Sequence, residues 1–131
     1  KVTPNQEYTL RFVGFASQEV ESMSVQFGGS ATPTGTVSYT PIVNKRVLST
    51  ERAETVQVTF TTGANDNYGV LRFDNNGSNG TVINSLFFGD IMLVEGTLMP
   101  SDYVHSPADF LTQLSSQNAR IAALEQAILN K

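Results

Sequence analysis

The stretch EYTLRFVGF at residues 7–15 alternates between apolar and other side chains. Tyr8, Leu10 and Phe12 fall on one side of an extended chain, whereas the residues between them, Arg11 included, fall on the other. A period of two places one side against a core and leaves the other toward solvent, as in a half-buried strand of an antiparallel sheet. The stretch therefore predicts a β-strand and an all-β domain around it.

The same alternation recurs up to about Glu95, broken by turns rich in Gly, Asn and Ser. It predicts further strands at residues 22–27, 37–43, 46–49, 56–60, 70–73, 81–88 and 90–94. Pro41 marks its strand as an edge strand because proline cannot donate to a ladder, and Gly89 marks a bend or bulge. Seven or eight short strands at this spacing predict an antiparallel sandwich or barrel.

At Ser106 the period changes to that of a helix. The run SPAD at residues 106–109 is typical of a helix start, with Ser106 as N-cap, Pro107 at the first position and Asp109 near the positive end of the dipole. The apolar seam then recurs every four and three residues, as in a heptad repeat. Its members are Leu114, Ile121 and Ile128 at position a, and Phe110, Gln117 and Leu124 at position d.

An isolated helix of this length is marginal in water and would expose the seam. One interpretation is that the helix folds back on the β domain; the other is that copies of the chain join in a parallel coiled coil. Gln117 at a d position, together with the resemblance described below, favours three copies. We expect a β domain over residues 1–105 and a coiled-coil helix over 106–131, and we expect the natural protein to continue beyond it.

Composition excludes several classes of function. The net charge of −4 leaves no basic footprint for nucleic acid, and no apolar run is long enough to insert into a membrane. The chain has no Cys and one His, which excludes disulfides and thiol chemistry and argues against a transition-metal site. We expect no enzymatic activity, because His105 has no nucleophile in a shared motif and the acid pairs Glu19/Glu21 and Glu51/Glu54 lie in polar connecting stretches.

A polar sheet face is the remaining candidate for a functional site. The residues opposite the predicted core positions include two guanidinium groups, an amide, a hydroxyl and a phenol ring. If their strands share one sheet, the face consists of Arg11, Gln57, Thr59, Tyr68 and Arg72. Planar hydrogen-bonding groups beside a flat ring suit sugar hydroxyls, although an ordinary solvated sheet face has the same pattern and the chain has no Trp for stacking.

Several stretches resemble one family. TPNQEYTLRF at residues 3–12 is similar to a strand of the carbohydrate-binding-module-type jelly rolls found in bacteriophage tail proteins. FGDIMLVEG at residues 88–96, followed by PSDY at 100–103 and SPAD at 106–109, resembles the closing strand, glycine turn and exit of such modules. TFTTG at 59–63 and LRFDNNG at 71–77 fit the intervening strands, so the resemblance covers roughly residues 2–109.

The resemblance implies a jelly-roll sandwich on a trimeric tail fibre, tail tip or baseplate, located extracellularly on the virion. Its partners would be copies of itself, other tail proteins and bacterial cell-surface polysaccharide. It also implies a structural calcium at Asp90, although Gly89 stands where such modules often have an acid. Because related modules carry one or two strands before the first motif, we expect the first strands to belong to a missing segment. The alternative to adhesion is an architectural domain that spaces the fibre and binds no glycan.

Overall fold

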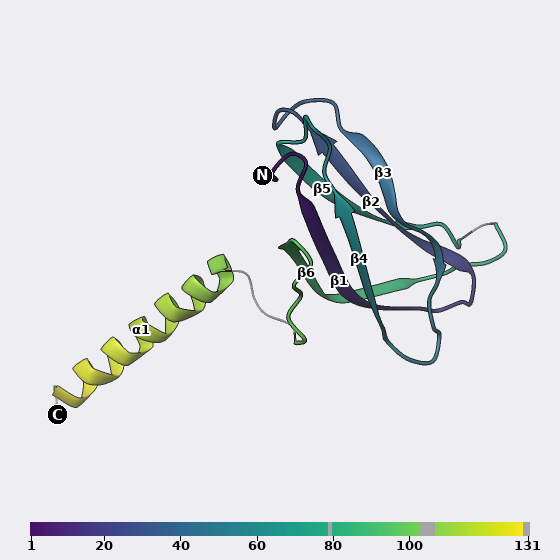
Figure 1. The fold of residues 1–131 in the computed structure, drawn as a ribbon. Coiled ribbons are helices and arrows are strands. Elements are labelled where there is room, and N and C mark those ends of the chain that lie inside the picture. The colour runs from purple at the N-terminus through teal and green to yellow at the C-terminus, as the bar shows by residue number, and fades with distance from the viewer. Residues whose placement is uncertain (79, 103–106, 130–131) are drawn as a thin grey trace. The chain divides into compact units, whose positions relative to one another are not determined.

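The computed structural model describes residues 1–78, 80–102 and 107–129, without the side chains of Ser22 and of residues 107–113. It contains mostly β-structure followed by one helix (Figure 1). The strands are β1 (Glu7–Ala16), β2 (Glu21–Ser30), β3 (Ser38–Val47), β4 (Glu54–Thr61), β5 (Tyr68–Asn75) and β6 (Leu86–Glu95), and the helix is α1 (Pro107–Leu129).

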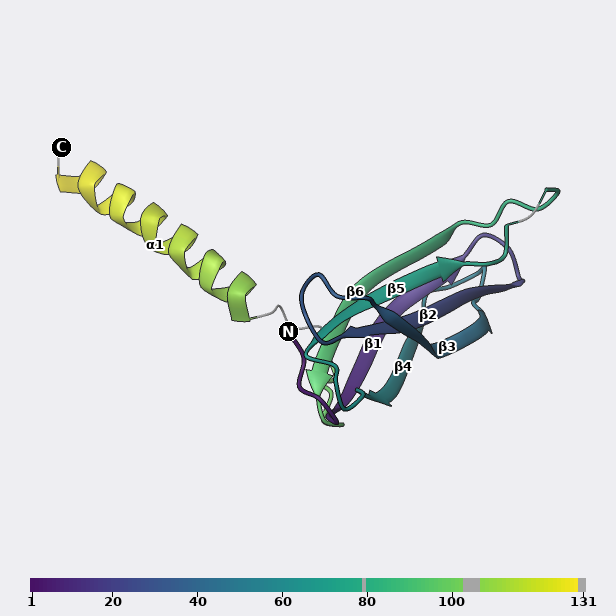
Figure 2. The ribbon, with the colours of Figure 1, turned by 90° about the horizontal axis from the view of Figure 1, so that it is seen from above.

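The strands form two three-stranded antiparallel sheets, ordered β4-β1-β6 and β3-β2-β5. Figure 2 shows the two sheets lying face to face, with β3 and β4 at the same edge of the two layers. Apart from the β2–β3 hairpin, each connection between consecutive strands crosses from one sheet to the other. The result is a β-sandwich-like domain, which confirms the antiparallel all-β prediction.

Alternate residues of β1 and β2 supply the centre of the core, as the period of two predicts. Leu10 and Phe12 of β1 and Met23 and Val25 of β2 are fully buried. The ring of Phe12 meets Phe73 of the opposite sheet edge-on, with 5.3 Å between centroids. Each such side chain contributes roughly 1.5–3 kcal/mol on transfer from water, so these strand faces hold the two sheets together.

The strand count differs from the prediction, because six strands form in the described residues where seven or eight were expected. The predicted strands on either side of Gly89 are one strand, β6, which contains a bulge where it passes β1 between Arg11 and Val13. Asp90 takes the left-handed backbone conformation there, with φ of 50°. The bulge absorbs one residue without ending the ladder. Likewise residues 46–47 end β3 and form no separate strand.

Residues 81–85 are also not a strand, contrary to the prediction. Asn84 is buried there and acts as the centre of a loop. Its carbonyl accepts from Asn75 Nδ2 at 2.6 Å and from Ser78 Oγ at 3.0 Å, and its Oδ1 accepts from the backbone of Gln18 at 3.0 Å. Because these bonds engage its carbonyl and side chain within the loop, β6 begins only at Leu86.

The chain divides into two compact units, residues 1–101 and 102–131. Helix α1 begins at Pro107, as predicted. The expected N-cap Ser106, His105 and the expected domain boundary between them lie outside the described residues. No helix in the described ranges is both long and apolar enough to cross a membrane.

Candidate binding face on the sheet of β2, β3 and β5

The five residues predicted to form one face lie on two. Arg11 and the pair Gln57 and Thr59 belong to β1 and β4 of one sheet, whereas Tyr68 and Arg72 belong to β5 of the other. The condition that their strands share a sheet is therefore not met, and the single face is wrong. All five alternate with core positions, so the two groups point outward from opposite sides of the sandwich.

The first group is largely engaged in structure. The guanidinium of Arg11 donates to the backbone carbonyls of Pro100 and, at 2.6 Å, of Ser101. Thr9 Oγ1 lies 3.1 Å from Thr59 Oγ1 and donates to the Gly96 carbonyl at 2.6 Å. These bonds fasten the segment after β6 onto the outer side of β1. Within the described residues, the exposed side chain of Gln57 is the one in this group that makes no hydrogen bond.

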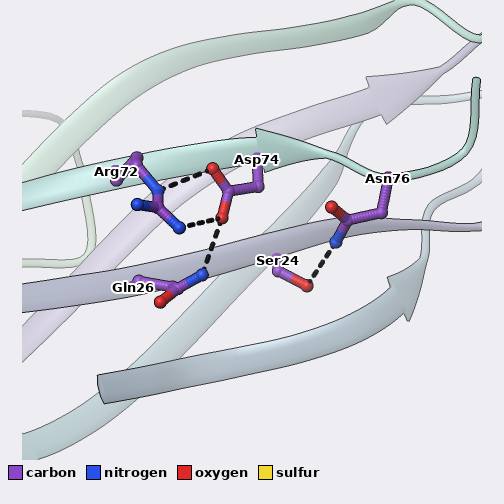
Figure 3. Close-up of polar contacts among 5 residues, drawn as sticks. All are labelled: Ser24, Gln26, Arg72, Asp74 and Asn76. Carbon is purple, nitrogen blue, oxygen red and sulfur yellow. Dashed lines mark hydrogen bonds and ion pairs between the residues drawn. The ribbon is translucent and has the colours of Figure 1, made fainter. Parts of the chain in front are cut away.

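The second group contains an ordered polar array on the outer side of β2 and β5 (Figure 3). Arg72 donates from Nε to Asp74 Oδ1 at 2.8 Å and from Nη2 to Oδ2 at 3.1 Å. Gln26 of β2 donates from Nε2 to the same Oδ2 at 2.8 Å. A bidentate guanidinium–carboxylate pair fixes the orientation of both groups, so these side chains are held in one geometry. We call the surface formed by Gln26, Tyr39, Tyr68, Arg72 and Asp74 the Arg72 face.

Tyr39 of β3 completes this arrangement. The guanidinium carbon of Arg72 lies 4.3 Å from the centroid of its ring, which is cation–π contact distance. The ring has room because Gly28 of β2 stands opposite Tyr39 in the ladder. A Cβ at Gly28 would lie 2.7 Å from Tyr39 Cε1 and 2.5 Å from Val37 Cγ1, closer than packing permits.

Strand register explains why the array forms. Gln26 pairs with Arg72 across the ladder, and Ser24 pairs with Asp74, so Gln26 reaches Asp74 diagonally. Arg72 and Asp74 are two residues apart on β5 and therefore share one side. Next to Asp74 in this array, Asn76 Nδ2 donates to Ser24 Oγ at 2.8 Å (Figure 3).

The charges of the pair stabilise each other. The hydrogen bond from Arg72, aided by that from Gln26, lowers the pKa of Asp74 below the ordinary value for an aspartate. In return the carboxylate of Asp74 raises the pKa of Arg72. The pair is solvent-accessible, so water screens much of this interaction. At neutral pH the face carries a fixed guanidinium and a fixed carboxylate.

Sequence reasoning included Tyr68 and Arg72 among the outward residues but did not include Gln26, Tyr39 and Asp74. The i, i+2 spacing of Arg72 and Asp74 was a readable signal, since both fall on one side of a strand. The partnership with Gln26 and Tyr39 depends on which strands flank β5 and β2, and the sequence does not give that order.

Asp90, the residue that the resemblance connects with calcium, lies exposed at the bulge of β6. Among the described residues there is no group of three or more His, Asp or Glu side chains that could hold a metal ion. The calcium at Asp90 stays a prediction.

The predicted seam on α1 is exposed in the single chain. Ile121, Leu124 and Ile128 are 53–68% exposed, and Leu114 is 39% exposed. Gln117, Ile121 and Leu124 line one shallow groove together with Arg120, so they share a side of the helix. The side chain of Phe110 lies outside the described residues.

Comparisons of the chain with protein-family models, with curated proteins and with solved structures gave no significant match.

Proposed function

We propose that this chain is a non-catalytic adhesion module of a bacteriophage tail, a jelly-roll sandwich that binds bacterial cell-surface polysaccharide through the Arg72 face. The observation that carries the proposal is the orientation of Arg72, which is braced by Asp74 and lies over the ring of Tyr39. A group held in its bound geometry loses little freedom on binding, and this improves affinity.

The chemistry of the face suits sugar hydroxyls. The guanidinium keeps N–H groups that Asp74 does not use, and these can donate to neighbouring hydroxyls of one ring. Gln26 presents an amide oxygen, and Tyr68 presents ring surface and a phenol group, while Tyr39 holds Arg72 in place. The array is shallow and exposed, so a single face would bind weakly.

Oligomerisation through α1 would compensate for weak binding. A stripe of exposed aliphatic side chains at heptad spacing is the feature that a coiled coil buries, and we propose a parallel trimer. Linked copies that reach one polysaccharide raise the apparent affinity by roughly 10²- to 10⁴-fold. Such a trimer would stand on the virion beside other tail proteins.

A glycan array with the whole chain, with and without calcium, tests the proposal. We expect a defined polysaccharide to bind the wild type, and Arg72→Ala and Tyr39→Ala to bind it at least about tenfold more weakly. Arg52→Ala removes the same charge from an exposed connecting segment and should bind like the wild type. Equal binding by Arg72→Ala and the wild type would exclude the Arg72 face.

A second candidate function is architectural, and one observation favours it. On the outer side of the other sheet, the rings of Phe15 and Phe87 stack with 4.5 Å between centroids and remain 38% and 47% exposed. Val13, Ala53 and Gly89 surround them in a shallow depression. Exposed stacked aromatic rings are typical of protein contacts, so this face would join a neighbouring tail protein. If a folded, oligomeric sample bound no glycan on the array, this architectural function would be favoured.

A further inference from the structure

The open edge of the sandwich between β3 and β4 contains a cleft of about 560 Å³. This volume lies within the range of small-molecule sites, roughly 300–1,000 Å³. Its lining includes Phe27, Ser38, Thr40, Phe60, Gly63 and Asp66. All of its lining residues lie in the described part of the chain, and none of them carries a positive charge.

The polar side of this cleft occupies positions that normally belong to a core. Thr40 stands opposite Phe27, and Ser38 stands opposite Gly29, so both alternate onto the inward side of β3. Both are nevertheless exposed. An inward-facing strand position is ordinarily apolar. Two hydroxyl side chains there indicate that the sheets are open to solvent at this edge rather than sealed.

The apolar side of the cleft is a pair of aromatic rings. Phe27 and Phe60 come from opposite sheets, with 4.9 Å between their centroids. Gly69 of β5 leaves room for the ring of Phe27, because a Cβ on Gly69 would lie 2.6 Å from Phe27 Cε2. Phe27 is buried and Phe60 is partly exposed, so Phe60 supplies the hydrophobic surface against which the C–H groups of a ligand can pack.

A carboxylate is fixed at one end of the cleft. Asp66 Oδ2 accepts from the backbone of Gly63 at 2.7 Å. The carboxylate lies against Gly29, where a Cβ would be 2.1 Å from Asp66 Oδ1, so only glycine leaves space for it. Within the described residues Oδ1 has no hydrogen-bond partner and can accept from a ligand.

We infer that this cleft is a second binding site, independent of the Arg72 face, and that it takes a neutral hexopyranoside. Hydroxyls of Ser38 and Thr40 form hydrogen bonds with sugar hydroxyls, and the carboxylate of Asp66 accepts from them, while Phe60 packs against the apolar face of the ring. The carboxylate repels uronic and sialic acids because no cation in the cleft compensates for a second negative charge.

The inference is tested by NMR titration of the whole chain with methyl glycosides of glucose, galactose, mannose and N-acetylglucosamine. Glucuronate and N-acetylneuraminate serve as acidic counterparts. We expect at least one neutral glycoside to shift the backbone amides of residues 38–40, 42 and 59–66, and neither acidic sugar to do so. If none of the four shifts these amides, or if the acidic sugars bind equally well, the inference is wrong.

Substitutions at Thr40 and Asp66 test the hydrogen bonds. Thr40→Val keeps the shape but removes the hydroxyl and should weaken binding about fivefold, whereas Thr40→Ser should retain it. Asp66→Asn keeps an acceptor for Gly63, should weaken neutral glycosides about tenfold and should admit the acidic sugars. Thr55→Val makes the same change on the outer side of β4, away from the cleft, and should have no effect.

Failure of this inference and failure of the Arg72 face can be told apart. Arg72→Ala should leave unchanged the amide shifts that the glycoside induces in residues 38–40, 42 and 59–66. Shifts confined to residues 24–26 and 68–74 would support the Arg72 face and overturn the second site. Unchanged binding by a folded Thr40→Val variant would also overturn it.

Discussion

Gly28 lies directly beneath the ring of Tyr39, on the neighbouring strand of the same sheet, and a methyl group at Gly28 would lie 2.7 Å from Tyr39 Cε1. The ring can lie close to the sheet only because this side chain is absent. Since the guanidinium of Arg72 lies over that ring, the position of Arg72 also depends on Gly28.

The first prediction is that Gly28→Ala displaces Tyr39 and destabilises the β domain. We expect a loss of about 1–3 kcal/mol in the free energy of unfolding, as for other overpacked sites. Urea denaturation of the whole chain measures it. Gly80→Ala is the matched control, because a Cβ at Gly80 meets no atom within 4 Å. Equal stability of the two variants would show that Tyr39 does not depend on Gly28.

The second prediction concerns pH. Because the pKa of Asp74 is lower in the folded chain than in the unfolded chain, its ionised form stabilises the fold. This contribution is fully present above the unfolded pKa and is lost as the pH falls through the folded pKa. The difference in unfolding free energy between wild type and Asp74→Asn should therefore shrink on acidification below the ordinary aspartate range. Carbon-detected NMR titration of the Asp74 carboxyl group gives the folded pKa directly, and an ordinary value would contradict the prediction.

The third prediction is that Arg11→Ala loosens residues 96–101. Its guanidinium holds the carbonyls of Pro100 and Ser101, and hydrogen bonds from a charged donor contribute more than neutral ones. We expect a loss of about 1–2 kcal/mol and faster proteolysis after β6. Gln57→Ala lies on the same side of the sheet and should change stability by less than about 0.5 kcal/mol. Cleavage at the wild-type rate would argue that Arg11 is dispensable.

The fourth prediction is that Ile121→Asp dissociates the oligomer. A carboxylate at a central heptad position would be buried without a partner in a coiled coil, which is costly. Light scattering should report a trimer for the wild type and a monomer for the variant. Ala119→Asp introduces the same group outside the heptad seam and should remain trimeric. An identical mass for wild type and Ile121→Asp would rule out assembly through α1.

The sequence was sufficient to predict those features that depend on local order. Alternation identified the buried side of β1, Pro41 identified an edge strand, and Pro107 identified the start of α1. These are set by backbone geometry within a few residues. The bend expected at Gly89 is present as a bulge, although the left-handed residue is Asp90.

Strand partnership was beyond the reach of the sequence. Arg11 and Arg72 occupy equivalent outward positions on their strands, and nothing local reveals that β1 and β5 belong to different sheets. Long-range pairing depends on how the whole core closes. The same limit explains why Gln26 and Tyr39 were missed and why residues 81–85, which are held by Asn84, were taken for a strand.

The edge strand β3 affects how copies of the protein associate at high concentration. Pro41 cannot donate a hydrogen bond, and Lys45 adopts a left-handed backbone with φ of 48°, so the outer edge of β3 offers a poor template for another strand. When many copies are crowded together, neighbouring sandwiches are thus discouraged from fusing edge to edge along β3. The mouth of the cleft opens beside this same strand, so a feature that resists aggregation also leaves an entrance accessible to small solutes.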